Sequence, residues 1–312
     1  MEIRLGTRRS DLARWQASHV ANLIRGVEPA AEVRIVFTSS VGDRDRRSSF
    51  HQFGGVGAFT KEGEDRLMRK EVDLVVHSLK DLPTRLRQGL VLAAVPKRED
   101  ARDAICGVTL DQLRPGLRVG TGSIRRKAQL LALCNGLDVR PIRGNVSPRL
   151  RKAKIRDGID ATLLAAAGLS RLGLLHEASQ VLDANVFPYA AGQGALAAEA
   201  REEDTELIAL LQKIEDRKSR TEVDAERALM RSLDAGCSLP IGVSATWVAG
   251  TLTLRGQVTH PDGQSKIADE CVGPADQAEA IGRRLGHKLL QQGAGEILKA
   301  VHRMMEVQGV LP

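Results

Sequence analysis

A lysine and an aspartate stand side by side just after an apolar run in the first third of the chain. Residues 74–76 read Leu-Val-Val, a β-branched run typical of a buried strand, and Pro83 prevents a simple continuation of that strand. Lys80 and Asp81 therefore follow its carboxyl end, the edge at which open α/β sheets bind ligands. Taken alone, such a pair is more often a solvated loop, so it marks a candidate site only in combination with other residues.

Arginines recur where a predicted strand turns into a predicted helix. The arginines at these three turns are Arg8 and Arg9, Arg125 and Arg126, and Arg143, with Arg149 and Arg151 further along the third helix. A cation in the first turn of a helix opposes the helix dipole, at a cost of about 0.3–1 kcal/mol. A bound anion would reverse the local field, and arginine adds a bidentate clamp for carboxylate. The repetition predicts a site for a polyanionic ligand, although any single arginine fits a solvated surface.

Nucleotide signatures are absent from the sequence. There is no G-x-x-x-x-G-K-[ST] motif and no G-x-G-x-x-G after a strand. Phosphate is not excluded as the anionic group, but no nucleotide-binding signature supports it.

The four cysteines, Cys106, Cys134, Cys237 and Cys271, form no C-x-x-C pair, which argues against a zinc site. Cys237 follows Gly236, a natural helix terminator, and so stands on a loop that opens the last part of the chain. By composition alone, a buried unreactive thiol is the better interpretation of Cys237.

Composition narrows the class of protein. The chain has 312 residues, of which 42% are hydrophobic and 27% charged, as expected for a globular protein of two or three domains. Its net charge of +7 suits nucleic acid or an acidic small molecule. Two Trp, one Tyr and five Phe are too few for a stacking platform for single-stranded nucleic acid. No apolar run reaches the length of a bilayer span, and the first residues lack the apolar core of a signal peptide. We expect a cytoplasmic protein.

Strands and helices alternate along the first two thirds of the chain, which predicts parallel βαβ units. The predicted strands are 3–7, 33–38, 74–76, 90–95, 117–120, 139–142 and 160–166, and the predicted helices 12–23, 60–70, 124–134, 145–156, 204–214 and 219–234. Residues 96–100 and 187–199 are interpreted as crossings between domains. Strands 243–248 and 251–258, then helices 274–292 and 294–306, predict a separate α+β domain.

At the level of whole motifs, the chain closely resembles the porphobilinogen deaminase family, also called hydroxymethylbilane synthase. The motifs that carry the resemblance are Thr7-Arg-Arg-Ser10, Trp15-Gln-Ala17, His77-Ser-Leu-Lys-Asp81, Arg98-Glu-Asp-Ala-Arg-Asp103, Val119-Gly-Thr-Gly-Ser-Ile-Arg-Arg126, Arg143-Gly-Asn145, Ala167-Gly-Leu169, Arg171-Leu-Gly173, Gly192-Gln-Gly-Ala195, Ala225-Glu-Arg-Ala228 and Gly236-Cys-Ser-Leu-Pro-Ile241. They run in order from the first strand to the last domain.

The resemblance implies an α/β fold class: two doubly wound domains similar to type II periplasmic binding proteins, and a C-terminal α+β domain. We expect the first domain to comprise residues 1–96 with 194–214, the second 97–193 and the third 215–312. A cytoplasmic monomer without a metal, without nucleic acid and without a membrane partner is implied.

The resemblance also implies the chemistry. A dipyrromethane cofactor in thioether linkage to Cys237 would prime the addition of four porphobilinogen molecules, each losing ammonia, before hydrolysis releases hydroxymethylbilane. Asp81 and Lys80 match the catalytic positions. The implied cofactor-binding residues besides Cys237 are Ser78, Lys80, Thr121, Ser123, Arg125, Arg126 and Arg143, and the implied substrate-binding residues are Arg8, Ser10, Arg149 and Arg171. We expect Arg126→Leu and Arg143→Leu to cost turnover but little stability.

Several positions depart from the family pattern. Gln52 and Val56 are neutral where basic residues are usual, Gly122 and Pro148 stand in place of serine and threonine, and Gly63 replaces leucine. Two alternatives therefore stay open: a relative that condenses another pyrrole, and a non-catalytic anion binder of the periplasmic-binding type.

Overall fold

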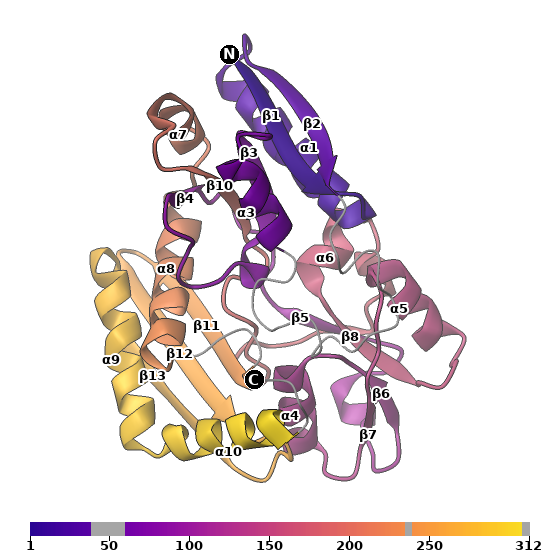
Figure 1. Ribbon diagram of the computed structural model, residues 1–312. Coiled ribbons are helices and arrows are strands. Elements are labelled where there is room, and N and C mark those ends of the chain that lie inside the picture. Colours follow the sequence, from indigo (N-terminus) through magenta and orange to yellow (C-terminus); the bar gives the residue numbers. More distant parts are fainter. Residues whose placement is uncertain (39–59, 235–238, 308–312) are drawn as a thin grey trace.

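The computed structural model describes residues 1–38, 60–234 and 239–307. Cys237, Gln52 and Val56, which the sequence singled out, lie outside the described residues. Within the described part of the chain, the strands form three separate sheets, two of five strands and one of three (Figure 1).

The first sheet has the order β2-β1-β3-β10-β4. β1 (Glu2–Arg8) pairs in parallel with β2 (Glu32–Thr38) and β3 (Leu74–Ser78), whereas β10 (Leu196–Arg201) is antiparallel to both β3 and β4 (Leu90–Ala94). The helices α1 (Asp11–Val27) and α7 (Thr205–Gln212) share one core with the sheet. On its other side, Leu67 of α3 (Lys61–Met68) packs against Val75. Helices on both faces make this unit doubly wound, as expected.

The second sheet repeats this plan in the order β7-β6-β8-β5-β9. β6 (Arg118–Gly120) is parallel to β7 (Asp138–Arg140) and β8 (Ala161–Ala165), and β5 (Asp103–Cys106) is antiparallel to β8 and to β9 (Gln180–Val181). The helix α4 (Ile124–Leu133) packs into one core, and α5 (Val146–Lys154) with α6 (Ala166–Arg171) into another. In both sheets, the inserted antiparallel strand is the one that follows a crossing of the chain.

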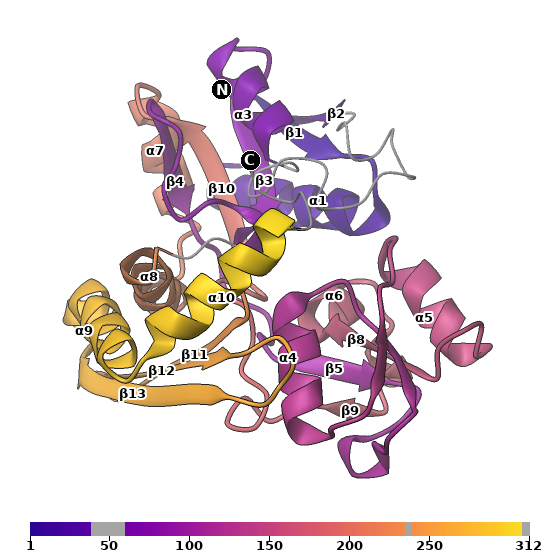
Figure 2. The ribbon, with the colours of Figure 1, turned by 60° about the horizontal axis from the view of Figure 1, so that its bottom comes forward.

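The third sheet is antiparallel throughout: β11 (Ile241–Val248), β12 (Thr251–Thr259) and β13 (Lys266–Pro274). The helices α8 (Arg217–Ser232), α9 (Ala278–Gln291) and α10 (Ala294–Val307) pack with it around one core, which includes Leu229, Leu285 and Val301 (Figure 2). The predicted fold class, two α/β units followed by an α+β unit, is therefore confirmed. The residue boundaries proposed for the three domains stay predictions.

Four strands were not predicted from the sequence. β5 and β9 have only four and two residues, too short for a periodic signal. β10 begins in the segment interpreted as the return crossing. It was missed because its buried residues include Glu199 and Arg201, which break an apolar pattern. β13 carries Lys, Asp and Glu and is mostly exposed at a sheet edge.

Both crossings between the first two sheets are attached to α8. The guanidinium of Arg98, in the first crossing, donates to both carboxylate oxygens of Glu226 at 2.8 and 3.0 Å. The backbone N–H of Gly192, in the return crossing, donates to the same carboxylate at 2.8 Å. Glu226 is fully buried. A bridge between Tyr189 and Val243 also connects the return crossing to the third sheet.

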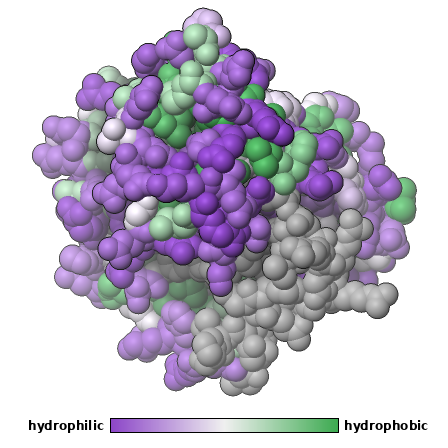
Figure 3. Space-filling view, turned by 45° about the horizontal axis from the view of Figure 1, so that its top comes forward, coloured by the Kyte–Doolittle hydropathy of each residue, from purple (hydrophilic) through white to green (hydrophobic). Residues whose placement is uncertain are grey.

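Among the described residues on the face that Figure 3 shows, the surface is mostly polar, with hydrophobic residues in small separate groups. Among the described residues, none of the helices combines the length and apolarity needed to cross a membrane.

Gly63 lets α3 approach β3 closely, which yields a test of the packing. A Cβ at Gly63 would lie 3.0 Å from Cγ1 of Val75 and 3.5 Å from Cε1 of His77. We expect Gly63→Leu to lower the free energy of unfolding by about 1–3 kcal/mol through overpacking, and Val75→Ala added to it to recover part of that loss. Urea unfolding of both variants checks this. As a control, Gly26→Leu places a side chain where no heavy atom lies within 4 Å. A double variant less stable than Gly63→Leu would contradict the packing argument.

Candidate active site

The Lys80–Asp81 pair lies on a short 3-10 turn, Leu79–Asp81, directly after β3. Leu79 is buried and its N–H donates to the carbonyl of Ala195 at 3.0 Å, which fixes the turn against the return crossing. The ammonium of Lys80 donates to Oε1 of Gln193 at 3.4 Å. Burial lowers the pKa of Lys80 to about 8, against the opposing attraction of Asp81. Asp81 itself is exposed.

The turn Thr121–Ser123 sets the start of α4. Oγ1 of the buried Thr121 accepts from the N–H of Ser123 at 3.1 Å, and Oγ of Ser123 caps the helix by accepting from the N–H of Arg126 at 3.4 Å. These hydroxyl groups place Arg125 and Arg126 in the first helical turn, as the sequence predicted.

Both arginines are buried, and the anion that holds them belongs to the protein. Asp103, at the start of β5, is fully buried. Its Oδ1 accepts from Nη2 and Nε of Arg126 at 2.6 and 3.1 Å, and its Oδ2 lies 2.8 Å from Nη2 of Arg125. Burial alone would raise the pKa of Asp103, but the two guanidinium groups hold it well below its usual range. The internal carboxylate thus reverses the field that a bound anion was invoked to reverse.

Asp103 was missed by the sequence analysis. It ends the motif Arg98–Asp103, which carried the resemblance, but the strand β5 that points it at α4 was not predicted. A signal was present all the same: adjacent arginines in a helical first turn require a nearby anion, and an aspartate opening a short apolar run is a candidate for it.

The third arginine-bearing turn lies near the second. Nε of Arg149, on α5, donates to the carbonyl of Gly144 at 2.7 Å. Burial and the neighbouring charge of Arg126 lower the pKa of Arg149 to about 10. Arg143, in the turn before α5, is exposed.

Arg171 contacts the first α/β unit. Its Nη2 donates to the carbonyl of Gly194 at 2.7 Å, and its guanidinium lies over the ring of Trp15, 5.5 Å from the centroid. Burial lowers its pKa to about 10, and its Nε is buried without a hydrogen-bond partner in the described structure. Arg171 therefore joins α6 to α1 and to the return crossing.

Three further predicted residues lie at one edge of the first sheet. Arg8 is partly buried at the end of β1, Ser10 caps α1 by accepting from the N–H of Ala13 at 3.4 Å, and Oγ of Ser78 accepts from Nε2 of Gln16 at 2.8 Å. Because β1 and β3 are parallel neighbours, their carboxyl ends share this edge.

The structure thus brings the basic residues of the second unit to the Lys80–Asp81 turn of the first. The charges that act on Lys80 are those of Asp81, Arg126, Asp103 and Arg125. Arg149 acts on this group through Arg126. Cations outnumber carboxylates in this set, so it fits a carboxylate-rich ligand such as a dipyrromethane. No group of three potential metal ligands occurs among the described residues.

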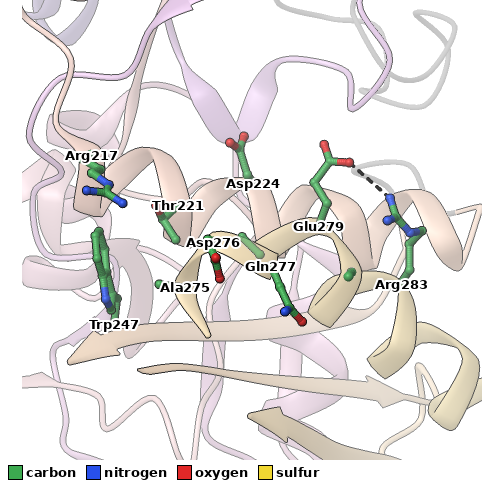
Figure 4. Close-up of a pocket in the computed structure, with 11 residues that line it drawn as sticks. Arg217, Thr221, Asp224, Trp247, Ala275, Asp276, Gln277, Glu279 and Arg283 are labelled. Atoms are coloured by element: carbon green, nitrogen blue, oxygen red, sulfur yellow. Dashed lines mark hydrogen bonds and ion pairs between the residues drawn. The ribbon is translucent and has the colours of Figure 1, made fainter. Parts of the chain in front are cut away.

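Two hollows lie elsewhere. One of about 450 Å³ lies between α8 and the start of α9 (Figure 4). There Arg217 lies over Trp247, and Glu279 pairs with Arg283 at 3.2 Å. The other, of about 670 Å³, lies beside Arg98 and the first crossing. Neither hollow is lined by Lys80 or Asp81. The candidate active site is therefore identified by its charged residues and their contacts, not by a hollow.

Comparisons with known proteins identify the family. Residues 3–209 match the family model "Porphobilinogen deaminase, dipyromethane cofactor binding domain", and residues 220–291 match "Porphobilinogen deaminase, C-terminal domain". The porphobilinogen deaminase of Pelotomaculum thermopropionicum is 44% identical over 301 residues, covering 96% of each chain. That of Chromobacterium violaceum is 43% identical over 304 residues, covering 96% of this chain and 98% of its own. A solved structure of the methionine-binding protein MetQ covers 68% of this chain and 89% of its own at 14% identity, with a TM-score of 0.43.

The fold and the excess of basic groups around Lys80 suit an enzyme that handles a carboxylate-rich small molecule. The chain belongs to the porphobilinogen deaminase family. It is a transferase with porphobilinogen deaminase activity in tetrapyrrole biosynthesis, and it binds a dipyrromethane cofactor. The alternative of a non-catalytic anion binder is therefore excluded.

The burial of Arg126 changes what its replacement should do. Arg126→Leu leaves a fully buried carboxylate with one partner fewer, so we expect a loss of roughly 2–4 kcal/mol in the free energy of unfolding. Arg143→Leu, at an exposed position, should stay within about 0.5 kcal/mol of wild type. Guanidinium chloride unfolding measures both. Equal midpoints for Arg126→Leu and wild type would show that Asp103 does not depend on Arg126.

Proposed function

We propose that this chain joins four porphobilinogen molecules in turn to a dipyrromethane held in thioether linkage by Cys237, and then releases hydroxymethylbilane by hydrolysis. When bound, the dipyrromethane supplies the free pyrrole carbon at which the product grows. Each addition expels one ammonia from porphobilinogen. The positive charge that this loss leaves on the pyrrole is the charge the protein must stabilise.

The observation that carries the proposal is the position of Asp81. Of the two carboxylates that act on Lys80, Asp103 is buried against two guanidinium groups, whereas Asp81 is exposed at the end of β3. Asp81 is therefore the carboxylate that a ligand can reach. It suits electrostatic stabilisation of the cationic pyrrole and transfer of its proton.

In this proposal the basic residues fall into two groups, one that binds the cofactor and one that binds substrate and product. Lys80, Arg125, Arg126 and Arg143 hold the acidic side chains of the cofactor, and Arg8, Arg149 and Arg171 hold those of incoming substrate and growing product. Ser78, Thr121, Ser123 and Ser10 support them, since the structure places these hydroxyl groups in the turns and caps from which the charged residues project.

The remaining expectations belong to the same proposal. The protein acts as a cytoplasmic monomer without metal or nucleic acid, in three domains: residues 1–96 with 194–214, 97–193 and 215–312. The distribution of strands among three sheets supports this division. The linkage to Cys237 is supported by the family match alone, because Cys237 lies outside the described residues.

The covalent primer gives a test by mass. Protein expressed in cells that make porphobilinogen should exceed its sequence mass by one dipyrromethane. We expect Cys237→Ser to lack the increment and Cys134→Ser to keep it. Intact-protein mass spectrometry checks all three proteins. A wild type at its sequence mass, or a Cys237→Ser variant with the increment, would rule out the linkage.

Asp81 separates charge stabilisation from binding. Asp81→Asn keeps the shape and loses the charge, so turnover should fall by roughly a hundredfold or more, while the KM for porphobilinogen changes much less. Asp81→Glu keeps the charge but displaces it, and should lie between Asn and wild type. The assay uses primer-loaded protein, with Asp111→Asn as an exposed control. Wild-type turnover in a fully primed Asn variant would remove Asp81 from the mechanism.

A further inference from the structure

Gln193 lies between the two halves of the site, and its amide has a fixed orientation. It is almost fully buried, at 1% exposed. Its Nε2 donates to the carbonyl of Ala101 at 2.8 Å and to Oδ1 of Asp103 at 2.9 Å. Both partners are acceptors only, so the amide nitrogen must face them. The amide oxygen is thereby turned to the ammonium of Lys80, at 3.4 Å.

The backbone of Gln193 is held as firmly as its side chain. Its N–H donates to the carbonyl of Ala190 at 2.9 Å, and its own carbonyl accepts from Nε of Arg98 at 2.9 Å. Gly192 and Gly194 on either side adopt positive φ angles of 72° and 83°. A Cβ at Gly194 would meet the carbonyl oxygen of Glu99 at 2.5 Å. The return crossing therefore approaches the first crossing closely at this point, and Gln193 has little freedom to reorient.

These contacts form one continuous path across the site. Arg126 and Gln193 both donate to Oδ1 of Asp103. The amide oxygen of Gln193 in turn accepts from the ammonium of Lys80. The path begins on α4 of the second unit, runs through the return crossing and ends on the turn after β3 of the first.

We propose that Gln193, oriented by Asp103, is a positioning residue for Lys80: its amide oxygen holds the ammonium group charged and aimed at the ligand's carboxylate. This inference rests on the role proposed above for Lys80. It assigns a function in the reaction to Gln193 and Asp103, neither of which needs to contact substrate or cofactor.

The direction of the effect follows from the charges around Lys80. Burial lowers its pKa to about 8, Asp81 and Asp103 act to raise it, and Arg126 and Arg125 act to lower it further. An acceptor for the ammonium group favours its charged form. Removing the amide oxygen, or the carboxylate that orients it, should therefore lower the pKa of Lys80. In such a variant, Lys80 loses its proton at a lower pH than in wild type. Turnover, which needs the charged form of Lys80, should therefore decline at a lower pH too.

The experiment measures Lys80 directly in primer-loaded protein. Trace acetylation across a pH series, read by peptide mass spectrometry, gives the titration midpoint of Lys80. We expect Gln193→Met to move this midpoint to lower pH by roughly half a unit. Its kcat at pH 8 should fall about tenfold, of which about twofold comes from the smaller charged fraction and the rest from the lost orientation of the ammonium group, with the KM for porphobilinogen within about twofold of wild type. Gln193→Leu also removes the amide oxygen and should move the midpoint in the same direction.

The control is a second buried glutamine. Gln129, on α4, donates instead to the carbonyl of Pro188 at 3.0 Å, so Gln129→Met should leave the midpoint unchanged. Asp103→Asn should repeat the shift of Gln193→Met, and if it does not fold the two Gln193 variants still decide the matter. An unchanged midpoint in both folded, primed Gln193 variants overturns the inference while leaving the proposed function intact. Wild-type turnover in Lys80→Met would instead refute the role of Lys80, and this inference with it.

Discussion

The site depends on a carboxylate that no solvent reaches. Asp103 is fully buried, and an isolated buried charge is so costly that its partners must stay in place. Those partners are Arg125 and Arg126 in the first turn of α4 and Gln193 in the return crossing. One side chain at the start of β5 thus fixes the register between a strand, a helix and a crossing. Removing any partner leaves charge uncompensated in a region of low dielectric.

This arrangement also explains how the arginines can be both structural and functional. Two guanidinium groups against one carboxylate leave an excess of positive charge, and Arg149 adds to it from α5. The excess cannot be relieved by rearranging the protein, because Asp103 already holds both neighbours. In the function proposed above, this excess attracts the acidic side chains of a pyrrole ligand, in surroundings dry enough to strengthen the attraction. The site is preorganised because its cations are held by the fold before any ligand binds.

Much of this could be predicted from residue patterns. The alternation of β-branched runs with amphipathic segments gave the first two α/β units, and arginines at strand-to-helix turns pointed to an anionic ligand. The prediction of strands failed where a strand buries charged side chains. β10 buries Glu199 and Arg201, and β5 opens with Asp103, so neither has the apolar signature of a central strand. Without β5, the adjacent arginines make Asp103 only a candidate partner for α4, and no pattern in the sequence places Gln193 beside Lys80, since those contacts span 23 and 113 residues.

Glu226 connects the third unit to the two chain segments that join the first two sheets. Because Arg98 and Gly192 bind the same buried carboxylate, the two chain segments that join the first sheets are clasped at one point on α8. A change in the angle between those sheets must either break the bonds to Glu226 or move α8 as well. Breaking a buried ion pair costs more free energy, so movement of α8 is favoured. α8 ends at Ser232, shortly before Cys237 in the chain. Any hinge motion between the two α/β units would therefore be coupled to the third unit through a single buried carboxylate.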